Sequence, residues 1–466
     1  MPLPTIPSGN VNSGLATGYD VANSVRYNDG DSPKLNINFG SDGTLNKWTF
    51  SMWFKRSTLG TAQRLFCCLD TGMDDYIKFG TDDQLEWVFD NEDGTNKGVL
   101  KTNRKFRDVG AFYHLVCRLD TTDGTAGDRM RMYINGTEET SFATDTNPAQ
   151  NETGDVGRDN DHFIGTTGSA QYFDGYIAEV CMINNQSLAP TSFGEFDEDS
   201  PTIWKPIDVS GLTVGTSGFY LDFEASDNLG NDAAGGTDWD ETNLAATDQS
   251  LDSPTNNFCT MNPLDSASDM TFAEGNLKVT SPDATWRSGK GTFAVGAGRW
   301  YMECKMTAFG TNADSTPINV GITKSIQDGT THSSVDAGRA MISSNDIVYE
   351  NVLASGDQTM DAGDSTGDII GIYLDLESGT INWYKNGASI GTSPASGTET
   401  VLSNGTLFAP ANGLYNSTVE WNFGSPTFSI SSSVSDDNGY GSFEYSPNIS
   451  TTKYYALCTK NLAEYG

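Results

Sequence analysis

The residues closest to a catalytic pattern are the carboxylates of "EFDEDS" at residues 195–200. Glycosidic bonds are cleaved by paired carboxylates, and Glu-x-Asp-x-x-Glu on a strand would place three of them on one face. Glu195 and Asp197 fit this spacing, but position 200 is Ser200. The stretch also follows the strands of the first half of the chain and does not lie on a central strand. We therefore predict no catalytic residue here.

Histidine offers little more for catalysis, since the chain has only His114, His162 and His332. His114 lies within "YHLVCR", where a packed or edge histidine is expected. The sequence contains no Gly-x-Ser-x-Gly elbow, P-loop, zinc-ligand cluster or dinucleotide fingerprint. We predict that the protein is not an enzyme. A polysaccharide depolymerase whose carboxylates converge from distant loops remains an alternative.

Aromatic side chains in polar segments could stack on sugar rings. Trp239 lies in "GGTDWDE", and Tyr440 and Tyr445 lie near the C-terminus. A Trp in a polar loop can equally cover a core or contact another subunit. We therefore assign no binding residue.

The seven cysteines are odd in number and scattered along the chain: Cys67, Cys68, Cys117, Cys181, Cys259, Cys304 and Cys458. Several lie in apolar strand patterns, where a reduced Cys behaves as a small hydrophobic residue. We expect core thiols in a protein assembled in a reducing cytoplasm.

The charge of the chain limits its partners. Lys and Arg number 27 against 62 Asp and Glu, for a net charge of -35. Such a surface repels phosphate backbones and anionic lipids, so we expect no nucleic-acid partner and no membrane insertion. The N-terminus has no basic region followed by an apolar core, and we expect no secretory signal.

Short β-branched and aromatic segments, separated by Gly, Asp, Asn, Ser and Thr, are typical of an all-β sandwich. The clearest strands of the first block are at 47–56, 64–70, 75–80, 84–90, 113–120, 129–134, 172–183 and 218–225. Those of the second block are at 275–280, 290–295, 299–306, 318–324, 368–376, 380–387, 407–415 and 418–424. Each block contains a Tyr-x-Asn-Gly, "YING" at 133–136 and "YKNG" at 384–387, which predicts a hairpin with a type I′ turn.

These patterns predict two antiparallel sandwiches in tandem. We expect an extended N-terminal arm at 1–20 and a first sandwich at 21–225. An acidic linker, or a connector lying over the surface, follows at 226–257. The second sandwich covers 258–430 and a C-terminal tail covers 431–466. The arm and the tail would serve docking or assembly.

Two stretches resemble known folds. "KWTFSMWFKR", "YHLVCRLD", "RMRMYINGTEE" and "FDGYIAEVCMINNQSL" resemble the concanavalin A-like/laminin G-like jelly roll. "WRSGKGTFAVGAGRWYMECKM", "GDIIGIYLDLESGTINWYKNG" and "LFAPANGLYNSTVEWNFG" resemble a SPRY domain. "TNNFCTMNPLD" at 255–265 and "YYALCTKNL" at 454–462 are similar to segments of virion proteins of marine tailed phages, which also combine these two folds.

The laminin G-like resemblance implies that one Ca²⁺ could bind at the rim of the sandwich. The candidate carboxylates are Asp29, Asp31, Asp74, Asp75 and Asp174. Asp in turns also caps backbone N–H groups, and no EF-hand spacing occurs. We assign no metal ligand and expect no other cofactor.

The resemblance favours a structural protein of the virion surface, such as a tail fibre, a tail appendage or a head decoration, assembled in the host cytoplasm. It would contact other virion proteins and attach to a host-surface glycan. The alternatives are a purely stabilising capsid or tail protein and a polysaccharide depolymerase. A homo-oligomer is expected, with a trimer favoured for a fibre.

Overall fold

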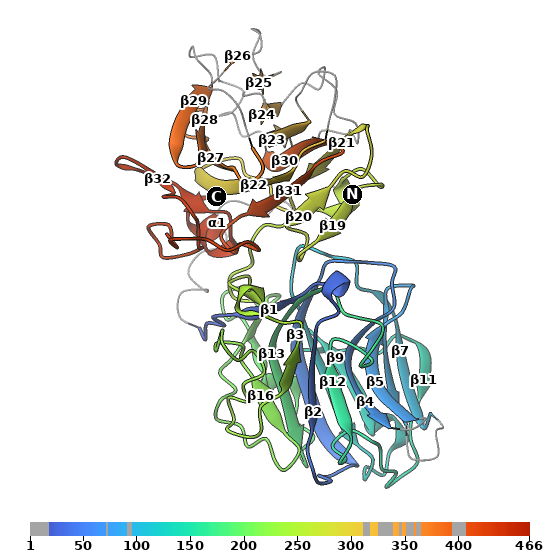
Figure 1. Ribbon diagram of the computed structural model, residues 1–466. Coiled ribbons are helices and arrows are strands. Elements are labelled where there is room, and N and C mark those ends of the chain that lie inside the picture. The colour runs from blue at the N-terminus through green and yellow to red at the C-terminus, as the bar shows by residue number, and fades with distance from the viewer. Residues whose placement is uncertain are drawn as a thin grey trace. The chain divides into compact units, whose positions relative to one another are not determined.

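The computed structural model describes residues 18–70, 73–90, 96–310, 317–324, 339–343, 347–350, 358–359, 365–393 and 407–466. The chain divides into two compact units, with the boundary between Thr255 and Asn256 (Figure 1). Each unit is a β-sandwich, as predicted. Within the described residues the single α-helix is α1 (Thr459–Tyr465).

The first unit is built from two eight-stranded antiparallel sheets, which we call sheet A and sheet B. Sheet A has the order β10 (Thr137–Glu138), β9 (Met130–Ile134), β8 (Tyr113–Asp120), β3 (Lys47–Arg56), β13 (Gly175–Asn184), β1 (Ser24–Tyr27) and β18 (Gln249–Ser250), and β16 (Phe219–Leu221) also pairs with β13. Sheet B has the order β11 (Phe142–Thr146), β7 (Gly98–Lys105), β6 (Gln84–Phe89), β5 (Met73–Phe79), β4 (Gln63–Asp70), β12 (Asp161–Ile164), β2 (Lys34–Asn38) and β17 (Asp240–Thr242). A separate hairpin joins β14 (Gly194–Phe196) to β15 (Trp204–Pro206).

The strand β3 shows how the alternation of side chains builds the core. Successive side chains of a strand point to opposite faces. Trp48, Phe50, Met52 and Phe54 therefore point into the space between the two sheets, where they belong to the main core. The intervening side chains, such as Trp53, are also buried because later residues cover the outer face of sheet A. The strand is thus buried on both faces.

Residues 226–257, expected as a linker or a surface connector, form part of the first sandwich up to Thr255. β17 extends sheet B beside β2, and β18 pairs with β1. Leu229 and Trp239 are buried in the main core of this unit. The Trp239 ring lies edge-on to Phe219, with ring centroids 4.7 Å apart.

The second unit also consists of two sheets, which we call sheet C and sheet D. Sheet C has the order β19 (Thr271–Ala273), β20 (Lys278–Thr280), β31 (Thr418–Asn422), β22 (Arg299–Ala308), β27 (Ile369–Asp375), β28 (Thr380–Lys385) and β29 (Ala388–Ser393), with β34 (Tyr455–Ala456) parallel to β22. Sheet D has the order β21 (Trp286–Lys290), β30 (Phe408–Tyr415), β23 (Ile318–Lys324), β24 (Arg339–Ser343), β25 (Ile347–Glu350) and β26 (Gln358–Thr359). A small hairpin joins β32 (Asn448–Ile449) to β33 (Thr452–Lys453).

Both Asn-Gly turns have the backbone that the sequence predicted. Asn135 and Gly136, between β9 and β10, have φ values of 48° and 73°. Asn386 and Gly387, between β28 and β29, have φ values of 50° and 79°. Positive φ at both central positions is the requirement of a type I′ turn, which matches the twist of the two flanking strands.

The C-terminal segment 431–466 folds onto the second sandwich, whose first residues it contacts. Phe258 and Cys458 form an antiparallel bridge. The Cys259 N–H donates to the Leu457 carbonyl over 3.0 Å, and the Thr459 N–H donates to the Asn257 carbonyl over 2.9 Å. The segments at 255–265 and 454–462 therefore lie side by side and close this unit together. The N-terminal arm lies outside the described residues, apart from its last three positions.

Candidate functional site

The two outer faces of the first sandwich differ in what covers them. Residues from 186–225 cover the outer face of sheet A. Side chains of this segment pack with side chains of β8, β9 and β13 and form a second apolar cluster. Its buried members are Val116, Tyr133, Cys181, Ile183, Phe193, Val209 and Tyr220. On the outer face of sheet B, by contrast, several polar side chains stay partly exposed.

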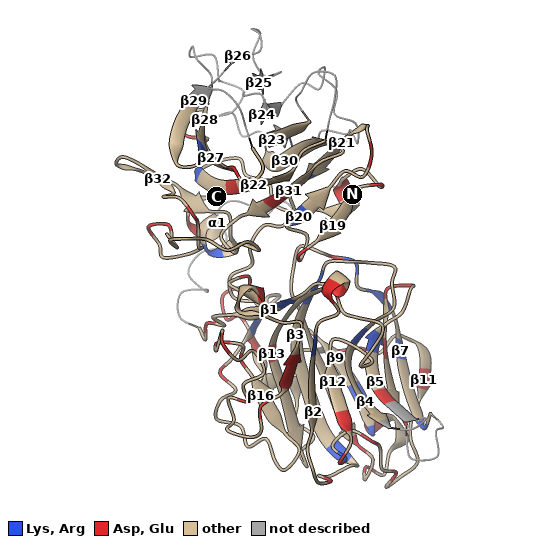
Figure 2. Ribbon diagram, viewed as in Figure 1, with Lys and Arg blue, Asp and Glu red and all other residues tan. Residues whose placement is uncertain are grey.

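Charged side chains form a row across the outer face of sheet B. Arg64 on β4 pairs in register with Lys78 on β5, and Lys78 lies opposite Glu86 on β6. Glu86 lies opposite Lys101 on β7. The Lys78 Nζ is 3.2 Å from the Glu86 carboxylate, and the Tyr76 hydroxyl donates to the same carboxylate over 2.9 Å. Figure 2 marks the Lys and Arg positions on these strands.

An aromatic ring lies within this charged row. The Arg64 guanidinium is 3.7 Å from the centroid of the Tyr76 ring, and the Lys78 ammonium is 4.6 Å from it. Arg64 is itself buried, at 5% exposure, whereas Tyr76 and Lys78 are partly exposed. The part of this row that solvent can reach therefore consists of Tyr76, Lys78 and the side chains of β6 and β7.

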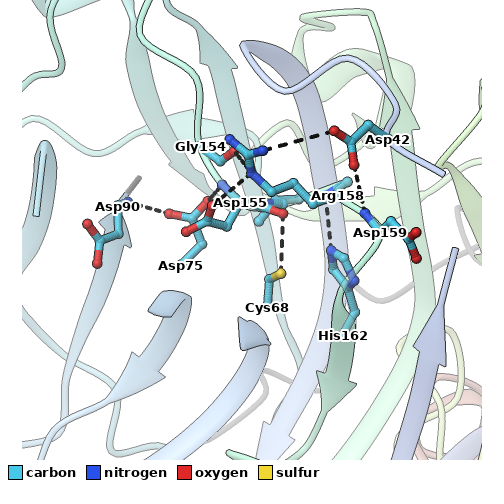
Figure 3. Close-up of polar contacts among 11 residues, drawn as sticks. Asp42, Cys68, Asp75, Asp90, Gly154, Asp155, Arg158, Asp159 and His162 are labelled. Atoms are coloured by element: carbon cyan, nitrogen blue, oxygen red, sulfur yellow. Dashed lines mark hydrogen bonds and ion pairs between the residues drawn. The ribbon is translucent and has the colours of Figure 1, made fainter. Parts of the chain in front are cut away.

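Asp75 belongs to a buried network beside this face (Figure 3). It accepts hydrogen bonds from the backbone N–H groups of Asp90, Asp155 and Val156, the last two over 2.8 and 3.0 Å. Burial raises the pKa of Asp75 to about 7, against the lowering effect of these bonds. Asp155 accepts from the Arg158 guanidinium over 2.9 Å. Asp75 therefore holds the loop at residues 154–156.

The calcium candidates do not converge in the part of the chain that the structure describes. No group of three or more His, Cys, Asp or Glu there could hold a metal ion. Asp29 and Asp31 lie on a 3-10 turn, where Asp31 accepts from the Asn28 amide over 2.7 Å. Asp174 is buried and accepts from the Thr58 hydroxyl. The side chain of Asp74 lies outside the description.

His114 has the packed position that the sequence predicted. The Trp204 indole N–H donates to His114 Nδ1 over 2.9 Å, and His114 Nε2 lies 2.8 Å from the Ser51 hydroxyl. Nδ1 therefore accepts, which places the proton on Nε2 and makes Ser51 the acceptor. Burial lowers the pKa of His114 to about 3, so the ring is neutral.

His162 is also a buried, neutral ring. Its Nε2 accepts from the Gly157 N–H over 2.9 Å, and its Nδ1 donates to the Asn160 carbonyl over 2.9 Å (Figure 3). Burial lowers the pKa of His162 to about 4. His332 lies outside the described residues.

Glu195 and Asp197 lie at the end of the β14–β15 hairpin. Both carboxylates are 3.3 Å from the Lys205 ammonium. Asp197 also accepts from the backbone N–H groups of Asp199 and Ser200 over 3.0 and 2.9 Å. Hydrogen bonds of this kind hold the turn of the hairpin.

The aromatic candidates of the sequence have different surroundings. Trp239 is only 2% exposed and covers the core of the first sandwich. Tyr440 lies under the Lys460 ammonium, 5.3 Å from its ring centroid. The Tyr445 ring packs directly against Gly387 in the type I′ turn. All seven cysteines are buried and free, as predicted.

Several carboxylates are buried although the sequence did not predict it, and two of them accept hydrogen bonds from tyrosine hydroxyl groups. The first is Glu179, at a bulge of β13 where the pairing with β3 shifts between Ala178 and Cys181. Its backbone has φ 50°, a conformation that costs free energy for a residue other than glycine. It accepts from the Tyr220 hydroxyl over 2.8 Å and from the Tyr19 hydroxyl over 3.4 Å. Burial raises the pKa of Glu179 to about 8.

Replacing Glu179 by Gln should flatten the pH dependence of stability in the first sandwich. The folded carboxyl binds its proton more tightly than an unfolded Glu, whose pKa is about 4.3. The wild type should therefore lose stability as the pH rises through the window from about 4.3 to about 8. Between pH 5.5 and 7.5, the free energy of unfolding of the Glu179→Gln protein should fall by roughly 2 kcal/mol less than that of the wild type, as measured by urea unfolding. Glu195→Gln is the matched control, and equal pH slopes in both variants would contradict this result.

The second buried carboxylate is Glu303, on β22 of sheet C. It accepts from the Tyr301 hydroxyl over 2.9 Å and from the Asn422 amide over 3.0 Å. The backbone N–H groups of Glu444 and Tyr445 donate to it over 3.1 and 2.8 Å. Burial raises the pKa of Glu303, and these bonds oppose that effect. Glu303 therefore fastens the C-terminal segment to sheet C.

Comparison with known families agrees with both fold resemblances. Residues 29–190 match the laminin G-like model described as the concanavalin A-like lectin/glucanases superfamily. Residues 299–426 match the SPRY domain. The protein is thus a two-domain β-sandwich protein. It contains a concanavalin A-like domain followed by a SPRY domain, as the sequence predicted.

Solved structures give only distant similarity. The SPRY domain of human HERC1 is 18% identical, and the match covers 34% of this chain and 96% of that one, with a TM-score of 0.28. A pentraxin from Limulus polyphemus is 15% identical, with coverage of 37% and 80% and a TM-score of 0.27. A putative carbohydrate binding protein from Bacteroides ovatus is 12% identical, with coverage of 48% and 59% and a TM-score of 0.33. No curated protein matches the chain.

In the described residues, no helix has the length and apolar character needed to cross a membrane.

Proposed function

We propose that the protein is a structural protein of a tailed-phage virion surface, and that its sandwiches attach the particle to a glycan of the host surface. The observation that carries this proposal is the outer face of sheet B. Arg64, Tyr76, Lys78, Glu86 and Lys101 meet there on neighbouring strands. The covered face of sheet A offers no comparable surface.

The surroundings of the acidic residues support a binding role without catalysis. Glu179 and Glu303 lie among hydroxyl, amide and backbone donors of the fold, and Asp75 lies among backbone N–H groups. Glu195 and Asp197 share a lysine at a hairpin turn. A glycosidase needs one carboxylic acid and one carboxylate facing each other across the bound sugar. These five residues are arranged to hold the chain and are not arranged around a ligand.

The pairing of residues 257–259 with 457–459 supports the phage assignment indirectly. These segments carry the resemblance to virion proteins, and they meet through backbone hydrogen bonds. The two segments close the second sandwich together, which explains why both of them would occur in proteins that contain this SPRY domain. The protein would then be displayed on the particle, where many copies convert weak glycan binding into firm attachment.

Virions that lack the protein would test the proposal. Intact particles that no longer adsorb to host cells are the expected result, and adsorption should return when the purified protein is supplied during assembly. Fragile heads or tails with normal adsorption would instead indicate a stabilising protein. New reducing ends after incubation of the purified protein with host polysaccharide would indicate a depolymerase. Either of the last two outcomes contradicts the proposal.

A further inference from the structure

We propose that the outer face of sheet B binds an anionic polysaccharide, carboxylated or sulfated, through a line of cations on β7 and directly before and after it. This inference rests on the proposed function, because it names the chemical class of the glycan. The cations are Lys97, Lys101, Arg104, Lys105 and Arg107, which we call the basic strand.

The basic strand is exceptional in so acidic a chain. Residues 97–107 read "KGVLKTNRKFR" and contain five cations and no acidic residue. The whole chain has only 27 Lys and Arg against 62 Asp and Glu. Arg104, Lys105 and Arg107 are exposed, and Lys101 is half-buried. A local excess of positive charge on an acidic protein concentrates anions at this one place.

The backbone of β7 directs these side chains outward. Leu100 belongs to the core and Thr102 is buried, so Lys101 and Asn103 point to the outer face. The pairing with β6 then shifts, since Glu86 lies opposite Lys101 whereas Gln84 lies opposite Lys105. Such a bulge re-aims the side chains that follow it. Here it leaves both Arg104 and Lys105 in solvent.

The acidic partners of Arg104 and Arg107 lie beneath these cations and do not cover them, whereas Lys101 pairs with the more exposed Asp82 over 2.8 Å. Arg104 is 3.0 Å from Glu139, and Arg107 is 3.5 Å from Asp83. The two cationic side chains are 48% and 55% exposed, whereas Glu139 and Asp83 are 7% and 4% exposed. Ion pairs at such exposure contribute about 0–1 kcal/mol each. The cations can therefore form further hydrogen bonds to a ligand at little cost.

The row across sheet B extends the basic strand into a surface. Lys101 belongs to both, and it lies opposite Glu86, which lies opposite the partly exposed Lys78; Arg64, beyond Lys78, is buried. Asn103 is exposed beside Lys101 and offers an amide for sugar hydroxyl groups. A ligand with charged groups separated by hydroxyl-bearing rings would match the alternation of Lys101, Asn103 and Lys105 along β7. Carboxylate and sulfate both accept charge-assisted hydrogen bonds from Lys and Arg.

A polysaccharide fits this surface better than a nucleic acid. Duplex DNA carries one negative charge per about 1.7 Å and would extend beyond five cations onto repelling surface. The net charge of -35 makes that repulsion strong. A polysaccharide that carries one charge or fewer per sugar, and that binds through only a few of its sugars, avoids most of this repulsion. Anionic lipid surfaces are disfavoured for the same reason as DNA.

The test compares binding of the full chain to polygalacturonate, dextran sulfate, uncharged dextran, poly(dT) and phosphatidylserine vesicles. The variant is Lys101→Gln with Lys105→Gln. The matched control is Lys278→Gln with Lys453→Gln, which removes the same charge from exposed positions of the second sandwich. Circular dichroism melts confirm that all proteins are folded. Titrations are run at 20 and at 200 mM NaCl.

We expect binding to polygalacturonate, to dextran sulfate or to both. The comparison of these two ligands shows whether the surface prefers carboxylate or sulfate groups. The Lys101 and Lys105 variant should bind roughly tenfold more weakly at low salt and depend less on salt, whereas the control should bind like the wild type. Equal loss in both variants, or preference for poly(dT) or vesicles, would overturn the inference. Binding of uncharged dextran alone would overturn it and leave the proposed function intact. Normal adsorption of virions that lack the protein would remove the proposed function, even if anionic glycans bind in solution.

Discussion

Replacing Trp239 by Ala should lower the free energy of unfolding of the first sandwich by about 3–5 kcal/mol. The indole is 2% exposed and lies edge-on to Phe219 in the main core. Its removal would leave a cavity that the surrounding strands cannot fill, because β17 is held to β2 by its backbone pairing. Urea unfolding followed by near-ultraviolet circular dichroism measures the change.

Phe196→Ala is the control for Trp239→Ala, since that ring is 42% exposed in the same unit. We expect it to cost less than about 1 kcal/mol, as for most surface substitutions. Similar losses in the two variants would show that residues 226–255 are not part of the folded core. The comparison therefore tests whether this acidic stretch is structural.

Replacing Glu303 by Ala should destabilise the second sandwich by about 3–5 kcal/mol and release its C-terminal segment. The substitution leaves the Tyr301 hydroxyl, the Asn422 amide and two backbone N–H groups without their carboxylate, in a buried place. Buried polar groups that lose a partner cost about 1–3 kcal/mol each. Guanidinium unfolding measures the stability, and limited proteolysis reports whether residues 431–466 become cleavable.

Glu420→Ala is the matched control, because Glu420 lies on the neighbouring strand β31 and pairs with the half-exposed Lys278. We expect a loss below about 1 kcal/mol and an unchanged proteolysis pattern. A Glu303→Ala protein that resists protease at the C-terminal segment would show that other contacts hold this segment. Such contacts exist in the bridge between Phe258 and Cys458.

Local patterns predicted both Asn-Gly turns and many of the strands, but not β1, β2, β7, β11 or β12, and the strand expected at 290–295 lies earlier, at Trp286–Lys290. The strand expected at 47–56 has those bounds, and both Asn-Gly pairs adopt the predicted turn. Alternating side chains and a requirement for positive φ are local properties, so a sequence displays them directly. The two resemblances then predicted the fold class, which the family matches confirm.

The buried carboxylates could not be predicted, because their burial depends on distant segments. Alternation places Glu179 on the outer face of β13, which would be exposed in an isolated sandwich. Tyr220 and Tyr19 cover it from positions 41 and 160 residues away. Glu303 is covered in the same way by residues more than 140 positions later. No short motif records such contacts.

Trp239 illustrates another kind of error, in which the composition of a segment gives no sign that one of its residues is buried in the core. The stretch around it is acidic and rich in Gly and Asn, which is typical of linkers. One buried Trp and two short pairings with β2 and β1 are nevertheless enough to order it. The candidate face on sheet B was also missed, because a row across strands joins residues that lie far apart in the chain.

The contact between Phe258 and Cys458 has a consequence for how the second sandwich can be handled. Its opening residues and those leading into α1 emerge as immediate neighbours. A domain with adjacent entry and exit points can be spliced into a surface loop of a carrier protein through short joints. The SPRY domain of this chain is therefore suited to transplantation as a cassette, or to circular permutation across that junction.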